Sequence, residues 1–222
     1  VLCGDFEIEK TMDLVKSKLL NTKSNGEIKR IFEEEPEQIK TKKIKTNMEV
    51  SIPSFMIAYK VKPCKKEIVK KHIAIEILLN IIAGKSSDLY DELYKEGLLN
   101  SPLDLEFEFS DSYAHILIGG QSKKPEKVLE KINKKIEQYK QNGIQEDEFE
   151  RIKKMIYGEY VREYNEVSNI SRMFLADYFK GINSFDYLEN CNQITIEYAN
   201  QILKDLFKEE KQVISIVNPK KD

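Results

Sequence analysis

The two histidines are the first residues to test for chemistry, because zinc sites in proteins use histidine together with acidic or cysteine ligands. His72 lies four residues before Glu76, so a helix would place both on one side. His115 lies in a strand-like segment, far along the chain. A catalytic zinc site needs three protein ligands, and the sequence contains neither His-Glu-x-x-His nor His-x-x-Glu-His. The sequence therefore predicts no metal ligand and no catalytic residue, and both histidines are interpreted as ordinary, partly exposed side chains.

Nucleophilic and phosphate-binding motifs are also missing. There is no Gly-x-Ser-x-Gly, and Cys3, Cys64 and Cys191 are widely spaced without a Cys-x-x-Cys pair. The run Gly84–Ser87 reads Gly-Lys-Ser-Ser, but Leu79 stands where a phosphate-binding loop would need its first glycine. The pattern favours a turn that ends one helix, with serines that cap the next.

Composition excludes several classes of protein. The 222 residues carry 36 basic and 38 acidic side chains, so no net field would hold a nucleic acid. The longest apolar run, Ile77–Ala83, is interrupted by Asn80 and is too short to span a membrane. The unpaired cysteines favour a reducing cytoplasm. The first residues lack both an initiator Met and a signal-peptide pattern, so we expect a piece of a longer protein.

Apolar spacing divides the chain into three parts. A short strand at Val1–Cys3 and a helix to about Leu20 are expected first, followed by a charged, apolar-poor stretch from Asn21 to Lys45. We interpret residues 1–24 as the last strand and helix of a preceding domain, residues 25–45 as a linker, and residues 46–222 as the main domain. A hinge is expected within residues 21–45.

The main domain alternates strands and helices in a characteristic order. Strands are expected at 54–61, 103–109, 113–118 and 212–217, and helices at 66–83, 88–94, 125–142 and 146–179, with one or two more in 184–207. Tyr157, Tyr160 and Tyr164 form a stripe on the long helix, which favours packing in a core or groove. This order predicts an α+β fold in which long helices pack on one face of an antiparallel or mixed sheet.

One stretch carries a family resemblance. Residues 74–98 read as a helix, a Gly-x-Ser-Ser-x-Leu turn, a short helix and a Gly-Leu; the hairpin at 103–119, the helix at 125 and the helix start at 143–153 follow in register. The order resembles the non-catalytic half of insulinase/pitrilysin zinc metallopeptidases, especially bacterial relatives of the mitochondrial processing peptidase. The first residues, with Cys3–Phe6, resemble the end of the preceding catalytic half.

The resemblance implies a function for the chain as one wall of a peptide chamber. In this family, zinc belongs to the first half, which would lie upstream of Val1 or on a homologous partner subunit, as in a dimer. The second half helps to hold peptide, through an Arg and a Tyr that correspond to Tyr94 and Asn100 here. Ser86 and Ser87, at a helix N-terminus, are further candidates for substrate binding. This chain alone is expected to be inactive and to hold no cofactor.

Two other functions remain open. The same fold could serve as a non-enzymatic scaffold subunit, or the chain could be an unrelated α+β binding module. A His-x-x-Glu-His motif upstream of Val1 in the parent gene would separate the peptidase from both.

Overall fold

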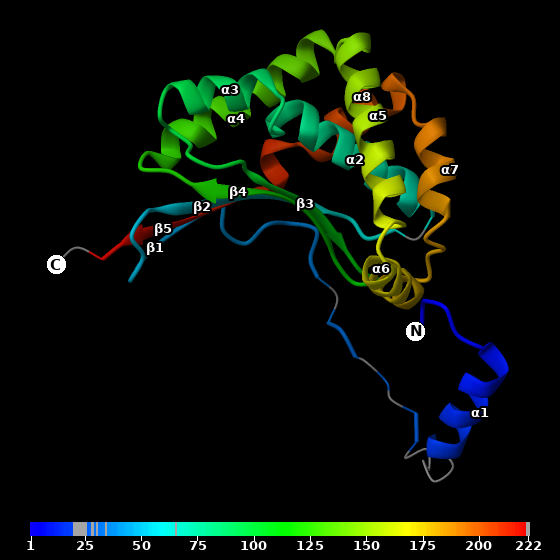
Figure 1. Cartoon of the computed structure of the whole chain (residues 1–222). Coiled ribbons are helices and arrows are strands. Elements are labelled where there is room, and N and C mark those ends of the chain that lie inside the picture. Colours follow the sequence, from blue (N-terminus) through cyan, green and yellow to red (C-terminus); the bar gives the residue numbers. More distant parts are fainter. Residues whose placement is uncertain (20–25, 28, 30, 34, 65, 221–222) are drawn as a thin grey trace.

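A five-stranded sheet forms the base of the molecule (Figure 1). The structure is a computed structural model, which describes residues 1–19, 26–27, 29, 31–33, 35–64 and 66–220. The strands are β1 (Lys43–Met48), β2 (Ser54–Val61), β3 (Asp104–Phe109), β4 (Ala114–Gln121) and β5 (Gln212–Pro219), in the spatial order β1-β5-β2-β4-β3. β1 pairs with β5 in parallel and the other pairs are antiparallel, so the sheet is mixed, as predicted.

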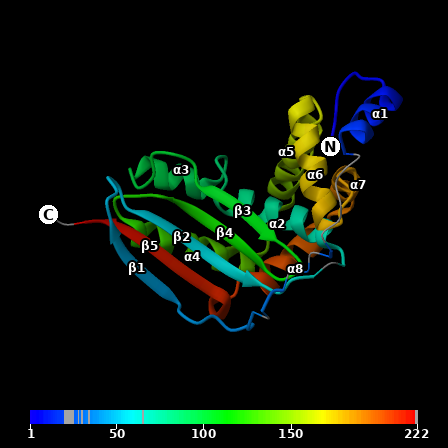
Figure 2. The same cartoon turned by 90° about the horizontal axis from the view of Figure 1, so that it is seen from below.

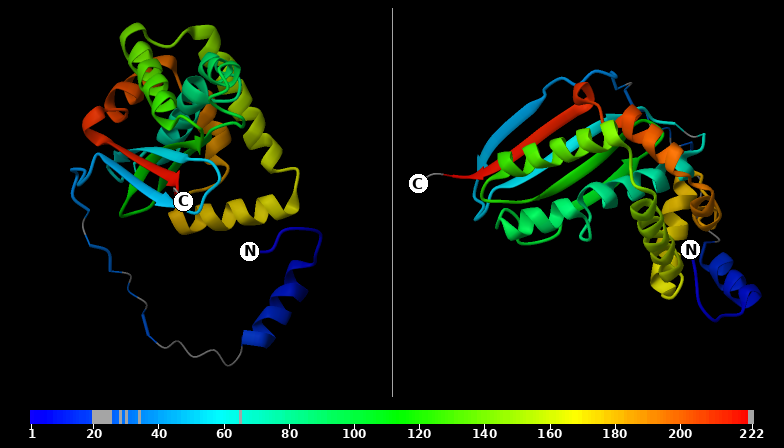
Figure 3. Two further views of the ribbon diagram at one scale, coloured as in Figure 1. Left: turned by 90° about the vertical axis from the view of Figure 1, so that its left-hand side faces the viewer. Right: turned by 90° about the horizontal axis from the view of Figure 1, so that it is seen from above.

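The helices lie mainly on one side of this sheet (Figures 1 and 3). They are α1 (Ile8–Leu19), α2 (Ile68–Ala83), α3 (Asp88–Lys95), α4 (Pro125–Asn142), α5 (Glu146–Glu163), α6 (Val167–Lys180), α7 (Asp186–Gln193) and α8 (Ile196–Leu206), and a short 3₁₀ turn, Glu209–Lys211, precedes β5. The expected α+β class, with helices on one face, is confirmed.

The core lies between the sheet and α2. Ten of the 16 residues of α2 are buried, because the helix is covered by the sheet below it and by other helices around it. In β2, Ile57 and Tyr59 point into this core and are almost fully buried. Gln212 Nε2 donates a hydrogen bond of 2.6 Å to the Tyr59 hydroxyl, which satisfies two polar groups inside the core.

No helix of the described residues covers the opposite face of the sheet, which faces the viewer in Figure 2. We call it the open face. It presents the alternate residues of each strand, because successive side chains in a strand point to opposite sides. Cross-strand partners on it include Asp104, Gly119, Met56 and Ser215 at one end, and Glu108, His115 and Lys60 at the other.

The predicted single helix over residues 146–179 is wrong, because the chain breaks it into α5 and α6. The break lies at Tyr164–Glu166, where the amide of Tyr164 bonds to the Val161 carbonyl and that of Asn165 to the Arg162 carbonyl. These are i→i−3 bonds, which tighten the last turn. The Tyr164 hydroxyl also donates to the Ser184 carbonyl at 3.1 Å, which ties the break to the segment before α7.

The N-terminal part differs from its sequence-based description in two places. Val1–Cys3 forms no strand, since no described segment pairs with it. Strand β1 was not expected, and it begins at Lys43 within the stretch interpreted as linker. Of the predicted hinge, residues 20–25, 28, 30 and 34 lie outside the described part. Helix α1 is present, has no buried residue, and stands away from the sheet (Figure 1).

Candidate functional site

The two histidines occupy separate environments. His72, on α2, shares a hydrogen bond of 2.8 Å between its Nδ1 and the Tyr187 hydroxyl, and its Nε2 lies 3.4 Å from Glu76 Oε1. His115 lies on the open face, where its ring stacks on Tyr113 with 5.8 Å between centroids. Within the residues that the structure describes, no three His, Cys, Asp or Glu side chains are grouped to hold a metal ion. The described side chains therefore offer no grouped set of ligands for zinc.

The serines of the Gly-Lys-Ser-Ser turn have structural partners. Ser87 is the N-cap of α3 and is 3% exposed; its Oγ accepts a hydrogen bond of 3.1 Å from the Tyr90 amide. This agrees with the capping expected from the sequence. The Ser86 Oγ accepts from Arg151 Nη1 at 3.2 Å, which links the turn to α5.

Tyr94 and Asn100 remain available on the surface. Tyr94, at the end of α3, is 57% exposed, and its ring stacks against that of Tyr90. Asn100 is exposed after the buried Leu98–Leu99, and the chain then runs directly into β3. A role for Tyr94, Asn100, Ser86 or Ser87 in substrate binding stays a prediction.

A groove of about 600 Å³ begins immediately beyond Asn100. Its walls come from residues 101–104 before and in β3, and from the neighbouring ends of β2, β4 and β5. Gly119 leaves room there, because a side chain would rise from the open face at this position. Gly120 points to the other side, where an added Cβ would lie only 2.7 Å from Leu103 Cδ2, so glycine permits this close packing.

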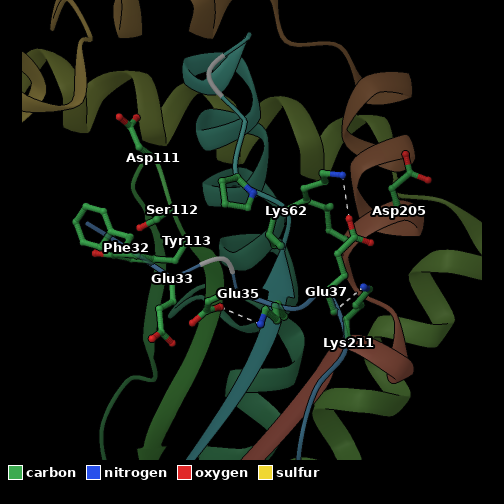
Figure 4. Close-up of a pocket in the computed structure, with 14 residues that line it drawn as sticks. Phe32, Glu33, Glu35, Glu37, Lys62, Asp111, Ser112, Tyr113, Asp205 and Lys211 are labelled. Carbon is green, nitrogen blue, oxygen red and sulfur yellow. Dashed lines mark hydrogen bonds and ion pairs between the residues drawn. The ribbon is translucent and has the colours of Figure 1, made fainter. Parts of the chain in front are cut away.

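A second cavity, of about 700 Å³, lies at the other end of the sheet (Figure 4). The linker contributes one wall, with Phe32, Glu33, Glu35 and Glu37, and the hairpin turn at 111–113 contributes another. Because Glu35 also lines a smaller cavity with Lys60 and His115, the linker lies against the open face at this end.

Two ion pairs hold the linker in place, and we call residues 35–37 the strap. Glu35 pairs with Lys60 at 2.9 Å and Glu37 with Lys62 at 2.9 Å, as Figure 4 shows. Lys211 Nζ also donates to the Glu37 carbonyl at 3.0 Å. The hydrogen bond and charge of Lys62 lower the pKa of the Glu37 carboxyl. Sequence reasoning missed this contact, although the matching i, i+2 spacing of the glutamates and lysines is a possible signal.

A known protein family matches the larger part of this chain. The model of the family described as "Peptidase M16 inactive domain" matches residues 1–156. The chain belongs to this family. The resemblance to the non-catalytic half of an insulinase-type zinc metallopeptidase is thereby confirmed.

Relatives and solved structures agree with this assignment. The M16 inactive domain is 26% identical over 197 residues to the uncharacterized zinc protease YmfH of Bacillus subtilis, covering 87% of this chain and 46% of YmfH. A candidate M16-like peptidase from Alicyclobacillus acidocaldarius superposes with a TM-score of 0.88 at 21% identity, over 97% of this chain and 52% of that one. A protease from Helicobacter pylori superposes with a TM-score of 0.84 at 19% identity, over 98% of this chain and 54% of that one. The chain thus spans about half the length of these proteins.

Proposed function

We propose that this M16 inactive domain is the second wall of a peptide chamber in a zinc-dependent peptidase. A zinc-bearing half, on the same chain or on a homologous partner subunit, supplies the metal and the catalytic residues. Within the described residues this domain groups no metal ligands, and the part we propose for it is to bind and orient peptide.

The observation that carries the proposal is the open face. No described helix lies over this face of the sheet (Figure 2), and successive side chains of each strand point alternately to it and to the core. Met56 is 44% exposed on it, and polar neighbours such as Ser215 and Asp104 surround the groove. A broad surface of this kind, with mixed apolar and polar groups, suits an extended peptide of varied sequence.

Two exposed residues of the segment before the groove are our candidates for peptide contact. Asn100 offers an amide directly before Ser101, which lines the groove, and Tyr94, on the preceding helix α3, offers an exposed ring with a polar end. These two residues take the positions at which the family resemblance places an Arg and a Tyr. Tyr94 and Asn100 carry no positive charge, unlike the Arg of the family pattern. We therefore expect them to form hydrogen bonds with the backbone and side chains of the peptide rather than to bind its carboxylate groups.

The test reunites the domain with its zinc-bearing half and measures hydrolysis of a fluorogenic peptide library. Replacing Tyr94 and Asn100 by Ala, singly and together, should raise KM or lower kcat/KM about tenfold for the pair, with the unfolding midpoint nearly unchanged. Tyr157→Ala, which removes an exposed tyrosine from α5, is the matched control. If kcat/KM of the double variant equals that of Tyr157→Ala, the site assignment fails.

A scaffold role has one observation in its favour. Tyr178 and Phe179 at the end of α6 are 74% and 79% exposed, and exposed aromatic pairs commonly mark protein contacts. Replacing both by Ser should weaken association with the other half. If association is lost while the reunited wild-type proteins hydrolyse no peptide, the domain is an assembly subunit and the chamber proposal is wrong.

A further inference from the structure

A third cavity lies within the helix layer, away from the open face. It measures about 290 Å³ and is enclosed by the first turns of α2, the end of α5, the middle of α6 and the start of α7. Neither its position nor its lining belongs to the groove or to the strap. Its lining residues are His72, Tyr160, Glu163, Tyr164, Met173, Ala176, Asp177, Ser184 and Tyr187.

Four of the nine lining residues carry aromatic rings, and their polar atoms already have hydrogen-bond partners. The Tyr160 hydroxyl donates to Glu76, and the Tyr187 hydroxyl bonds to His72. The Tyr160 and Tyr187 rings pack on each other with 5.2 Å between centroids, and His72 meets Tyr187 edge-on at 5.4 Å. These contacts fix the orientations of the rings that line the cavity.

A carboxylate lies among these rings. Asp177 is only 9% exposed, and its Oδ2 accepts a 2.6 Å hydrogen bond from Ser184 Oγ. No described residue is seen to donate to its other oxygen. Glu163 adds a second carboxylate to the lining, and no lysine or arginine lines the cavity. Burial raises the pKa of Asp177, although the hydrogen bond from Ser184 and the charges of Lys180 and His72 act in the opposite direction.

Lys180, on the same helix as Asp177, makes its ion pair outside the cavity lining. Lys180 follows Asp177 by one helical turn, but its Nζ lies 3.5 Å from Glu108 Oε1 and 4.3 Å from the centre of the Phe109 ring. This places the ammonium group against β3 and outside the cavity lining. The carboxylate and rings therefore face a space that no cation of the described chain fills.

We propose that this cavity binds an alkylammonium group. Aromatic faces attract a cation through their quadrupoles, and a desolvated carboxylate adds a charge-assisted hydrogen bond. The cavity is large enough for an ammonium head with a few methylene groups, and too small for a whole folded segment. The same chemistry is offered by a free amine, by a lysine side chain and by the N-terminal amine of a peptide. The inference does not depend on the proposed chamber.

The experiment uses the chain as described, with n-butylammonium as the probe and n-butanol as its uncharged counterpart. Binding is followed by NMR through the ring signals of Tyr160 and Tyr187. Butylammonium should shift these signals saturably, and butanol should need at least about ten times the concentration for the same shift. Equal responses to both compounds, or no saturable shift, would overturn the proposal.

Two variants test the carboxylates directly. Asp177→Asn keeps an acceptor for Ser184 and removes the charge, and it should weaken butylammonium binding about tenfold. Glu163→Gln should weaken it less. Asp186→Asn, the same change on α7 outside the cavity, should bind like the wild type. Circular dichroism confirms that each variant is folded, and unchanged affinity in both folded Asp177→Asn and Glu163→Gln refutes the assignment.

Two further probes, compared with butylammonium, distinguish the sources of the ammonium group. Nα-acetyl-lysine methylamide offers only a side-chain amine, leucinamide offers only an α-amine, and butylammonium represents a free amine. The probe with the highest affinity identifies the source. If acetylating the preferred amine leaves its affinity unchanged, the cavity recognises something other than an ammonium group and the proposal fails.

Discussion

The two faces of the sheet differ although the same strands form both. On the helix-covered face, Ile57 and Ile118 are fully buried and lie opposite each other across β2 and β4. On the open face one residue away, Met56 is 44% exposed and lies opposite Gly119. The contrast indicates that the free energy of folding comes mainly from one face, which leaves the other free to vary for binding.

Truncation of neighbouring residues on β2 should give the largest difference between the faces. Ile57→Ala removes a fully buried side chain and should lower the free energy of unfolding by about 2–5 kcal/mol. Met56→Ala should change it by no more than about 0.5 kcal/mol. Urea unfolding of the two variants measures both values, and similar losses would show that the open face is covered in solution.

Filling the groove should affect binding without affecting folding. A Cβ at Gly119 would lie 3.6 Å from the Phe55 carbonyl oxygen, which is ordinary contact, so Gly119→Val should fold normally. In the reunited enzyme we expect about a tenfold loss of kcat/KM, because the side chain occupies the groove. Gly158→Ala, on the helix side, is the control. It should stabilise α5 by up to about 1 kcal/mol and leave hydrolysis unchanged.

The pH dependence should arise on the helix-covered side. Asp177 is the buried carboxylate among the described residues, and burial raises its pKa above the ordinary value of 3.8. Between the unfolded and folded pKa values, the folded state therefore binds more protons than the unfolded state. The contribution of Asp177 to the free energy of unfolding is full below the unfolded pKa and is lost as the pH rises through the folded pKa.

Urea unfolding at a series of pH values tests this sign. Asp177→Asn should flatten the fall in stability above pH 3.8, whereas Glu106→Gln on the exposed edge strand should not. If the free energy of unfolding of Asp177→Asn falls with pH as steeply as that of the wild type, another group causes the fall.

The smallest effect is expected at the strap. Replacing Lys60 and Lys62 by Ala removes both ion pairs to residues 35–37, and limited proteolysis of the linker should become up to about threefold faster. Sodium chloride at about 0.5 M should have the same effect on the wild type, since exposed pairs are screened. First cleavage should fall within residues 21–45. First cleavage within residues 146–179 would contradict the domain division.

Local signals made much of the fold predictable. Pro125 and Gly143 bracket α4 as expected, because proline suits the first helical turn and glycine suits the residue after the last. The hairpin of β3 and β4 followed from strict alternation. β1 escaped notice because its lysines resemble linker residues, although charged residues are common on edge strands.

The candidate sites were less predictable, because they depend on contacts between distant residues. The strap joins residues 35 and 60, and the ammonium cavity joins His72 to Tyr187. The Tyr157, Tyr160 and Tyr164 spacing predicted packing in a core or groove. Helix α6 forms a wall of that cavity only because α5 ends at Glu163, and no local sequence pattern indicated this break. The segment 84–100 was located from the family resemblance.

The most direct test of the central claim measures zinc content and peptide hydrolysis for this domain alone, for its zinc-bearing half alone, and for the two together. The account predicts no stoichiometric zinc and no hydrolysis for the domain alone, and chelator-sensitive hydrolysis that appears or rises strongly in the mixture. About one tightly bound zinc per isolated domain, with peptidase activity that a chelator abolishes, would contradict it.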